Sequence, residues 1–429
     1  MRKILGEKLK FLARLILKRY HPTIIGVTGS LGKTSAKEAI YKVLEDSHSV
    51  RMSQKNYNNE IGLPLTIIGA TSAGRNLWVW FLIFWRALFL ILIKDKNYPQ
   101  VLILEMGVDR PGDMIYLTSI VSPTVGLVTG VSYSHLEYFG AVANIKKEKQ
   151  ILIESVNSQG LAILNYDNEL SRSMVSASQA KVLTYGLQEG ADLRAQDIVY
   201  NFNKGNYELA GINFKMNYRG SIVPVFMDHV LSETSIYAAL AAAAVAIYFD
   251  MNLVDVANAL RNFYLPKGRM NILAGVKHSF IIDDTYNSSP ESAIAAVKIL
   301  GKIQVEDNAT KYAVLGDMLE IGSYTEEGHR RLGEAIVKNG VSHLIAVGER
   351  SRDIIRGATE AGLADDYIFY FDKAAEAGQF LQNRIKAGDV ILVKGSQGVR
   401  LEKVVKEIMA EPERAEELLV RQGVEWADK

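Results

Sequence analysis

One loop constrains what this chain can fold into more than any other feature, and it reads Thr28-Gly29-Ser30-Leu31-Gly32-Lys33-Thr34-Ser35. A β-branched run at 23–27 precedes it and a helix-like stretch at 36–40 follows. That order predicts a strand, a phosphate-cradling loop and a helix N-terminus, with backbone N–H groups and the positive helix end facing phosphate oxygens. We expect Lys33 to reach the outer phosphates and the Thr34 hydroxyl to reach Mg²⁺ in an ATP or GTP site.

The loop is a variant of the usual phosphate-binding pattern. Val27 stands five residues before Gly32, at a position where that pattern has glycine. The alternative interpretation is a glycine-rich turn that binds nothing. Because Gly-Lys-Thr-Ser follows a hydrophobic strand, the sequence favours the nucleotide site over that turn.

Length and composition indicate more than one α/β domain. The chain has 429 residues, more than one hydrophobic core usually holds, and 48% of them are hydrophobic. It has no cysteine, which excludes disulfides and cysteine-ligated zinc and favours a cytoplasmic location. The net charge of +1 gives no indication of nucleic-acid binding, so we expect no nucleic-acid partner.

The two ends of the chain differ in charge. The first twenty residues carry seven Lys or Arg against one Glu. An apolar stripe of Leu5, Leu9, Leu12 and Ile16 makes residues 1–21 a basic amphipathic helix. Two interpretations stay open, a helix packed on the following domain and a helix lying on an anionic membrane surface. Residues 409–429 are acidic, and we expect a helical tail there.

Residues 77–93 are apolar except for Arg86 and contain three of the four tryptophans. As a helix they would span about 25 Å, less than the roughly 30 Å hydrocarbon core of a bilayer. If Lys33 and Glu105 belong to one nucleotide site, both ends of this segment lie on the same side of any membrane, which excludes a single crossing. A monotopic helix, a re-entrant hairpin, a partner-binding surface and a buried core helix stay open as interpretations.

Beyond Pro99 the pattern alternates strands with helices. A short apolar strand at 101–104 ends in Glu105, whose carboxylate we expect to hold Mg²⁺ beside the phosphate loop. A strand at 125–129 leads to His135 and then to a helix that contains Lys149. Taken alone, a loop histidine and a helical lysine are more often solvated surface residues.

Several segments, taken together, resemble the Mur ligase family. The family's phosphate loop also lacks the first glycine, so Val27 fits it. The other segments resemble the members that add D-alanyl-D-alanine to the cell-wall precursor, and the resemblance runs in order from about residue 22 to 408. The segments that carry it are 26–34, Asn56-Tyr57-Asn58-Asn59-Glu60-Ile61-Gly62-Leu63-Pro64-Leu65-Thr66, Ile282-Asp283-Asp284-Thr285-Tyr286-Asn287-Ser288-Ser289-Pro290, Leu315-Gly316-Asp317-Met318-Leu319-Glu320-Ile321-Gly322 with His329, and Val393-Lys394-Gly395-Ser396.

The resemblance implies ATP and two Mg²⁺ ions as cofactors. Thr34 and Glu105 match ligands of the first ion, and His135 and Lys149 match ligands of the second. Lys149 corresponds to a lysine that reacts with CO₂ to form a carbamate, which turns a cation into an anionic ligand. Lys33, His135 and Lys149 are therefore the expected catalytic residues.

Other site residues are implied in the same way. ATP contacts are expected from the loop residues Gly29, Ser30, Leu31, Gly32, Lys33, Thr34 and Ser35, and also from Arg269, Asp284 and Asn287. Substrate contacts are expected from Asn58, Asn59, Asp317, Met318, Lys394 and Ser396. Because Asp284 and Asn287 belong to the C-terminal domain, domain closure is expected to complete the site.

The expected fold is a two-domain α/β ligase. A parallel-sheet P-loop ATPase domain is expected at 22–268, with the apolar insert at 77–93, followed by a smaller Rossmann-like domain at 269–408. The implied reaction adds D-alanyl-D-alanine to UDP-N-acetylmuramoyl-tripeptide through an acyl phosphate. Such phosphoryl transfer depends chiefly on positioning and electrostatics.

Two departures from the family keep other functions open. We expect its N-terminal uridine-binding domain to be absent, which leaves open how the uridine end is recognised and whether a partner chain supplies that domain. The apolar segment at 77–93 is also longer and more apolar than the same stretch in typical members. One alternative is a ligase of the same mechanism acting on a lipid-linked muropeptide or a poly-amino-acid. Another is a non-catalytic, nucleotide-dependent membrane-binding protein. Peripheral attachment through 1–20 and 77–93 would place the protein at the inner face of the plasma membrane.

Overall fold

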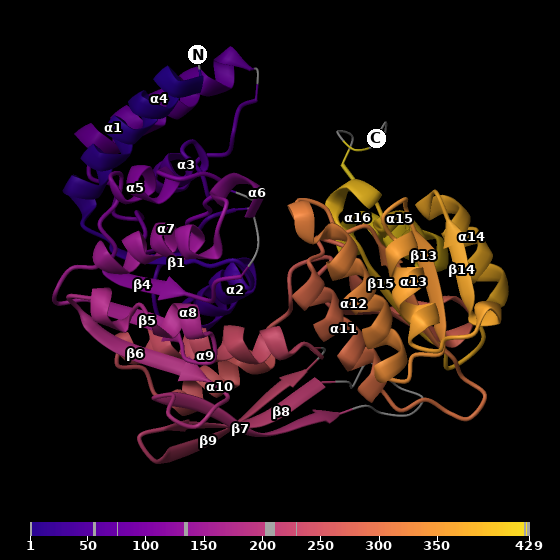
Figure 1. The fold of residues 1–429 in the computed structure, drawn as a ribbon. Coiled ribbons are helices and arrows are strands. Elements are labelled where there is room, and N and C mark those ends of the chain that lie inside the picture. The colour runs from indigo at the N-terminus through magenta and orange to yellow at the C-terminus, as the bar shows by residue number, and fades with distance from the viewer. Residues whose placement is uncertain are drawn as a thin grey trace. The chain divides into compact units, whose positions relative to one another are not determined.

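The computed structural model describes residues 2–54, 57–74, 76–132, 136–201, 211–228, 230–423 and 426. The chain divides into two compact units, which are treated separately below (Figure 1). The first unit comprises Met1–Ile198, Phe214–Phe226 and Thr234–Phe263. The second unit comprises Val199–Asn213, Met227–Glu233 and Tyr264–Lys429.

A nine-stranded sheet organises the first unit, in the order β2-β3-β1-β4-β5-β6-β7-β8-β9. The pairs from β2 through β7 are parallel. β3, β4 and β5 are buried along their whole length, as expected of parallel strands covered on both faces. The strands are β1 (Thr23–Thr28), β2 (Val50–Met52), β3 (Val101–Glu105), β4 (Val125–Val128), β5 (Leu161–Asn165), β6 (Lys181–Gly186), β7 (Leu193–Asn201), β8 (Gly211–Tyr218) and β9 (Ser221–Asp228).

Helices cover this sheet, which confirms the predicted α/β class. Strands β2 and β3 lie on one side of β1, and the chain then crosses to β4 on its other side. Ligands bind α/β sheets at such a switch point. The helices are α1 (Arg2–Tyr20), α2 (Lys33–Leu44), α3 (Gly62–Ile68), α4 (Leu77–Leu92), α5 (Asp113–Thr118), α6 (Leu136–Phe139), α7 (Val142–Glu154), α8 (Glu169–Arg172), η1 (Val175–Ala177), α9 (Glu233–Tyr248) and α10 (Leu253–Arg261).

The basic helix α1 packs on the first unit. Leu9, Ala13 and Ile16 are fully buried in its main hydrophobic core. Lys10 Nζ donates to Ser119 Oγ at 2.6 Å, and Tyr20 Oη donates to the Ile93 carbonyl at 3.1 Å. The packed-helix interpretation is therefore correct, while the opposite side of α1 stays exposed.

The apolar segment forms helix α4, which lies against α1 (Figure 1). Asn76 caps it, because its side-chain oxygen accepts from the N–H groups of Trp78 and Val79. Ile83, Ala87 and Leu90 are its only buried residues, so it is not the buried core helix that was one interpretation. Within the described ranges, no helix combines the length and apolar character that crossing a membrane requires.

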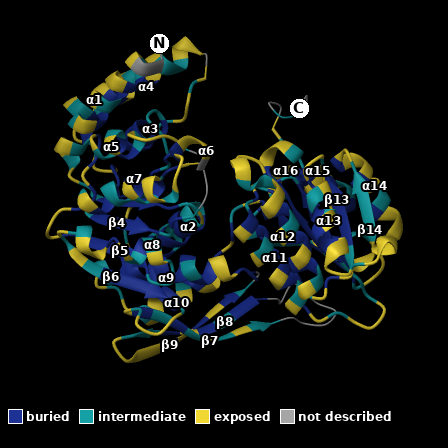
Figure 2. Cartoon of the chain, in the orientation of Figure 1, coloured by how far each residue is buried: buried dark blue, intermediate teal, exposed yellow. Residues whose placement is uncertain are grey.

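A six-stranded sheet organises the second unit, in the order β10-β11-β15-β12-β13-β14. All its pairs are parallel except β10 with β11, as expected for a Rossmann-like domain. The central strands β11, β15, β12 and β13 are almost wholly buried, whereas the edge strand β14 is intermediate in burial and is teal in Figure 2. The strands of this sheet are β10 (Asn271–Gly275), β11 (Ser279–Asp284), β12 (Lys311–Gly316), β13 (His343–Val347), β14 (Ile368–Phe371) and β15 (Val390–Lys394).

The acidic tail is less helical than expected. Between 409 and 423 it holds one 3₁₀ turn, η7, and the four-residue α16, and Leu419 packs into the core of the second unit. The helices of this unit are η3 (Val276–His278), α11 (Pro290–Lys302), η4 (Gly322–Tyr324), α12 (Thr325–Lys338), α13 (Arg352–Glu360), η5 (Asp365–Tyr367), α14 (Ala374–Arg384), η6 (Gln397–Val399), α15 (Glu402–Ile408), η7 (Pro412–Arg414) and α16 (Ala415–Leu418).

Candidate active site

The phosphate loop joins the end of β1 to the start of α2. Gly32 adopts a left-handed conformation (φ 77°) directly before α2, where a residue with a Cβ would be strained. Gly29 has a φ of 151°, and a Cβ there would lie 1.9 Å from Thr129 Oγ1. Both glycines are therefore required by the backbone, and α2 directs its N-terminus at the space where phosphate would bind.

Two lysines meet at one carbonyl of this loop. Lys33 Nζ donates to the Gly29 carbonyl at 2.8 Å, and Lys149 Nζ on α7 donates to the same oxygen at 3.1 Å. Lys149 is buried. Burial, with the charge of Lys33 second, holds the pKa of Lys149 well below its ordinary value, although Asp109 and Glu148 oppose this. Burial therefore makes the neutral amine of Lys149 more accessible than that of an exposed lysine.

A carboxylate stands on the other side of the loop. Parallel pairing places Glu105, at the end of β3, beside Val27 at the end of β1. Thr34 Oγ1 donates to Glu105 Oε2 at 3.1 Å, and Asn58 Nδ2 donates to Glu105 Oε1 at 3.2 Å. Oxygen donors from one hydroxyl and one carboxylate suit Mg²⁺, which takes its other ligands from substrate phosphates and water. The residues present therefore fit the expected first ion.

The expected second ion depends on His135 and Lys149. His135 lies outside the described residues, so its role stays a prediction. Within the described residues no cluster of three Asp, Glu or His side chains could hold a metal.

Asn59 was expected to contact substrate, and in the structure its side chain caps a helix. Its Oδ1 accepts from the N–H groups of Ile61 and Gly62 at the start of α3.

In the second unit, expected site residues meet at the carboxyl ends of β11 and β15. Asp284 and Lys394 are register partners on these strands, and Lys394 Nζ lies 2.7 Å from Asp284 Oδ2. Lys394 Nζ also donates to the Asn287 carbonyl at 2.9 Å. Lys394 is almost fully buried, so its ion pair with Asp284 holds Nζ in position for the hydrogen bond to the loop that carries Asn287.

The neighbouring strand β12 adds Asp317 and Met318 to this edge. Ser396 Oγ accepts from the Leu319 N–H at 2.9 Å, and the Ser396 N–H donates to the Asp317 carbonyl at 3.0 Å. His329 Nε2 accepts from the Met318 N–H at 2.9 Å, and its Nδ1 lies 2.6 Å from the Thr325 carbonyl. This pattern requires a neutral ring protonated on Nδ1, and burial lowers the pKa of His329 accordingly.

Sequence reasoning missed the part that the tail plays at this edge. Arg421 donates to the carbonyl oxygens of Thr285 and Tyr286 and forms a 3.0 Å ion pair with buried Glu402. The Arg269 guanidinium lies 4.3 Å from the ring centre of Tyr286, so the tail holds the loop against which Arg269 packs. The tail's composition gave no signal for this role, because Arg421 is one of three basic residues in a tail that is acidic overall.

Family models match most of the chain. The Mur ligase middle domain matches residues 27–80 and 88–246, and the "Mur ligase, glutamate ligase domain" matches residues 268–397. The second match covers all the expected site residues of the second unit.

Curated relatives and solved structures agree with these matches. UDP-N-acetylmuramoyl-tripeptide–D-alanyl-D-alanine ligase from Bacillus subtilis is 27% identical over 94% of this chain and 79% of its own length. The Mycobacterium leprae protein of the same name is 31% identical over 88% of this chain and 72% of its own length. The MurF ligase of Thermotoga maritima in complex with ADP is 27% identical with a TM-score of 0.76, covering 95% of this chain and 84% of that one. MurF from Acinetobacter baumannii is 25% identical with a TM-score of 0.77, covering 93% and 79%. From these matches and the two sheets that carry the expected residues, the chain belongs to the Mur ligase family.

Proposed function

We propose that the chain is an ATP-dependent ligase that joins D-alanyl-D-alanine to UDP-N-acetylmuramoyl-tripeptide. One observation carries the proposal: Lys33, Lys149, Thr34 and Glu105 converge on one phosphate loop, in a chain whose similarity to ligases of that name extends over most of its length. The arrangement of these four residues supports phosphoryl transfer, and the names of the similar ligases indicate the substrates.

The reaction has two steps. The terminal carboxylate of the tripeptide attacks the γ-phosphorus of ATP, an O–P bond forms, and the bond to ADP breaks. The amine of D-alanyl-D-alanine then attacks the acyl carbon, the C–N bond forms, phosphate leaves and the amine loses a proton. Lys33 and the N-terminus of α2 stabilise negative charge on the transferred phosphoryl group.

Two Mg²⁺ ions bound here would neutralise the phosphate oxygens and lower the barrier to attack. Thr34 and Glu105 would hold the first, and His135 with a carbamate on Lys149 would hold the second. The lowered pKa of Lys149 supports the carbamate, because only a neutral amine can attack CO₂. In that step a N–C bond forms as one C–O π bond of CO₂ breaks, the amine loses a proton to solvent, and the lysine side chain becomes an anionic carbamate suited to a metal.

A second acceptor is favoured by a specific feature of the first unit. Helix α4 exposes large apolar side chains, as a protein that meets lipid-linked substrates at a membrane would. A lipid-linked muropeptide is therefore the alternative acceptor for the same chemistry.

Phosphate release tests the proposal. Purified protein with Mg²⁺-ATP and bicarbonate is given D-alanyl-D-alanine with the UDP-linked tripeptide, with a lipid-linked muropeptide in detergent, or with no acceptor. We expect release with the UDP-linked tripeptide and a pentapeptide product mass. Lys33→Ala should remove that release, whereas Lys181→Ala, at an exposed lysine on β6, should not. Release with the lipid-linked acceptor alone would replace the proposal with the alternative.

A further inference from the structure

Helix α4 presents a continuous apolar face that no described part of the chain covers. Leu77, Trp78, Trp85 and Leu92 are 83%, 72%, 62% and 67% exposed. Together with Phe81, Leu82, Leu88 and Phe89 they occupy one side of the helix along its whole length. A patch of this size on one helix marks an interaction surface.

The single charged residue of α4 does not interrupt this face. Arg86 lies at its margin, and Arg86 Nε donates to the Ile68 carbonyl of α3 at 3.0 Å. The guanidinium is thus held toward the body of the first unit. With 16 residues, α4 is about 24 Å long and is suited to lie in a surface and not to cross it.

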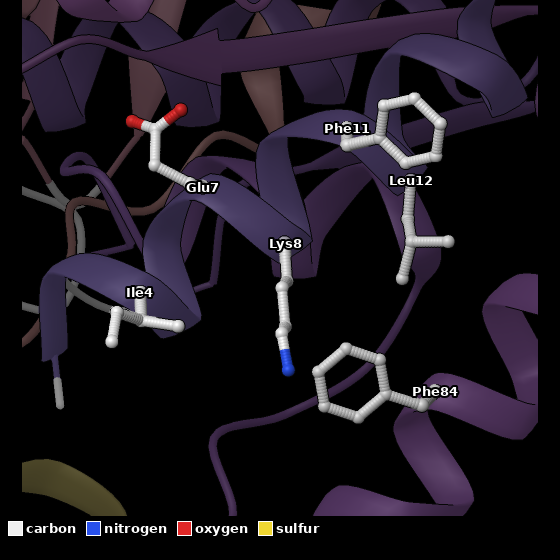
Figure 3. A pocket seen from close by; sticks show the side chains of 6 residues that line it. All are labelled: Ile4, Glu7, Lys8, Phe11, Leu12 and Phe84. Atoms are coloured by element: carbon white, nitrogen blue, oxygen red, sulfur yellow. The ribbon is translucent and has the colours of Figure 1, made fainter.

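Helix α1 continues the exposed surface beside α4 and adds positive charge. An open groove of about 650 Å³ runs along the two helices, lined by Phe84 of α4 and by Ile4, Glu7, Lys8, Phe11 and Leu12 of α1 (Figure 3). Basic residues predominate among the exposed charges of α1, with Glu7 as the one acid. They are Lys8, Arg14, Lys18 and Arg19.

The family model matches only part of this surface. The match to the Mur ligase middle domain is interrupted at residues 81–87, in the middle of α4. The interruption removes Phe81, Leu82 and Trp85 of the apolar face, and the whole of α1 precedes the match. The phosphate loop, Glu105 and Lys149 lie within the matched ranges, so these parts of the surface are separate from the residues of the nucleotide site.

We propose that α1 and α4 form a docking surface for an anionic phospholipid bilayer. The exposed side of α4 lies in the membrane plane with its apolar side chains among the acyl chains, and Trp78 and Trp85 sit at the headgroup boundary. The basic residues of α1 contact lipid phosphates. The positive charge of α1 favours an anionic bilayer over a second copy of the chain as the partner. Two copies meeting at this face would bring the same basic side chains together, and these would repel one another. The proposal does not depend on the ligase activity.

Vesicle binding tests it with the full chain at low salt. We expect co-flotation with phosphatidylglycerol-containing vesicles, weaker binding to pure phosphatidylcholine, and loss of binding as salt rises. Because three of the four tryptophans lie in α4, intrinsic fluorescence should shift to the blue on binding, and brominated lipids should quench it.

Matched variants locate the surface. Phe81→Ser with Phe89→Ser keeps all tryptophans and should weaken partitioning about 100-fold, at about tenfold for each aromatic side chain. The control is Ile222→Ser with Phe226→Ser, which removes side chains of similar exposure from β9 and should leave binding unchanged.

A second pair of variants tests the charge. Arg14→Glu with Lys18→Glu should weaken binding to anionic vesicles at least tenfold, whereas Lys147→Glu with Lys181→Glu, at exposed lysines elsewhere, should not. The proposal would be overturned if the protein does not co-float with vesicles at low salt, or if Phe81→Ser with Phe89→Ser binds vesicles as strongly as the wild-type protein. A third result would also overturn it: a protein that binds no vesicles, forms a dimer by light scattering, and becomes monomeric in the Phe81→Ser with Phe89→Ser variant.

Discussion

Replacing Lys149 with methionine separates a catalytic role from a structural one. Methionine keeps most of the side-chain volume but cannot form a carbamate or donate to Gly29. If a carbamate on Lys149 holds a metal ion in the transition state, its loss should lower kcat by about 10²- to 10³-fold, as for other single electrostatic groups in active sites. That corresponds to about 3–4 kcal/mol of lost transition-state stabilisation.

Stability should move little in this variant. Lys149 is buried beside Lys33 with a lowered pKa, so an apolar side chain of similar volume should change the free energy of unfolding by less than about 1.5 kcal/mol. The pH dependence has a definite sign. Between the lowered native pKa and the unfolded value near 10.4, the unfolded state binds more protons. The wild-type protein should therefore gain stability relative to Lys149→Met as pH rises through that window.

Lys37 is the matched control. It is also buried, and its Nζ donates to one backbone carbonyl, that of Ser53, at 2.7 Å. Lys37→Met leaves that carbonyl and the nearby Glu38 without their partner, so it should cost about 1–3 kcal/mol of stability while kcat at a temperature below the transition is kept. The assays are phosphate release at saturating bicarbonate and urea unfolding from pH 7 to 10. Equal kcat for wild type and Lys149→Met would refute the carbamate. An equally large loss of kcat in Lys37→Met would show that removing any buried lysine lowers kcat, and that the loss in Lys149→Met is not evidence for a catalytic role.

Three further changes have defined outcomes. Lys33→Ala should reduce ATP turnover at least 100-fold with little change in stability, measured by phosphate release and thermal unfolding, and unchanged turnover would contradict the phosphate-loop assignment. Asn58→Ala removes a donor from Glu105 and should weaken Mg²⁺ activation about 10- to 100-fold in a metal titration, while an unchanged titration would assign that contact a purely structural role. Arg421→Ala leaves buried Glu402 with fewer partners and should cost about 3–5 kcal/mol in denaturant unfolding, whereas a loss below about 1 kcal/mol would show that the tail does not hold the loop it contacts.

Local patterns in the sequence were sufficient to predict the phosphate-binding end of the first sheet. The strand, loop and helix around Lys33 follow from nearby residues. The position of Glu105 follows from the rule that parallel strands end at a common edge. Lys149 could not be placed this way, because 120 residues separate it from Gly29 and only the fold brings them together. The role of Lys149 was predicted only from the resemblance to the family.

Other features were not accessible from the sequence. The apolar character of 77–93 was evident, but which side of α4 is exposed depends on how Ile83, Ala87 and Leu90 pack. The contact of Arg421 with the 285–286 carbonyls was hidden because a tail's composition does not reveal where it folds back. Burial and long-range packing are properties of the folded chain, so local patterns do not determine them.

The acyl-phosphate mechanism is tested most directly by following an oxygen atom. The tripeptide's terminal carboxylate is labelled with oxygen-18, and the protein is supplied with Mg²⁺-ATP, bicarbonate and D-alanyl-D-alanine. If the carboxylate attacks the γ-phosphorus, one labelled oxygen must appear in the released phosphate for each amide formed. Labelled phosphate together with the pentapeptide mass is the predicted result. Amide formation with unlabelled phosphate would contradict the mechanism, and absence of both products from protein that binds ATP would contradict the substrate assignment.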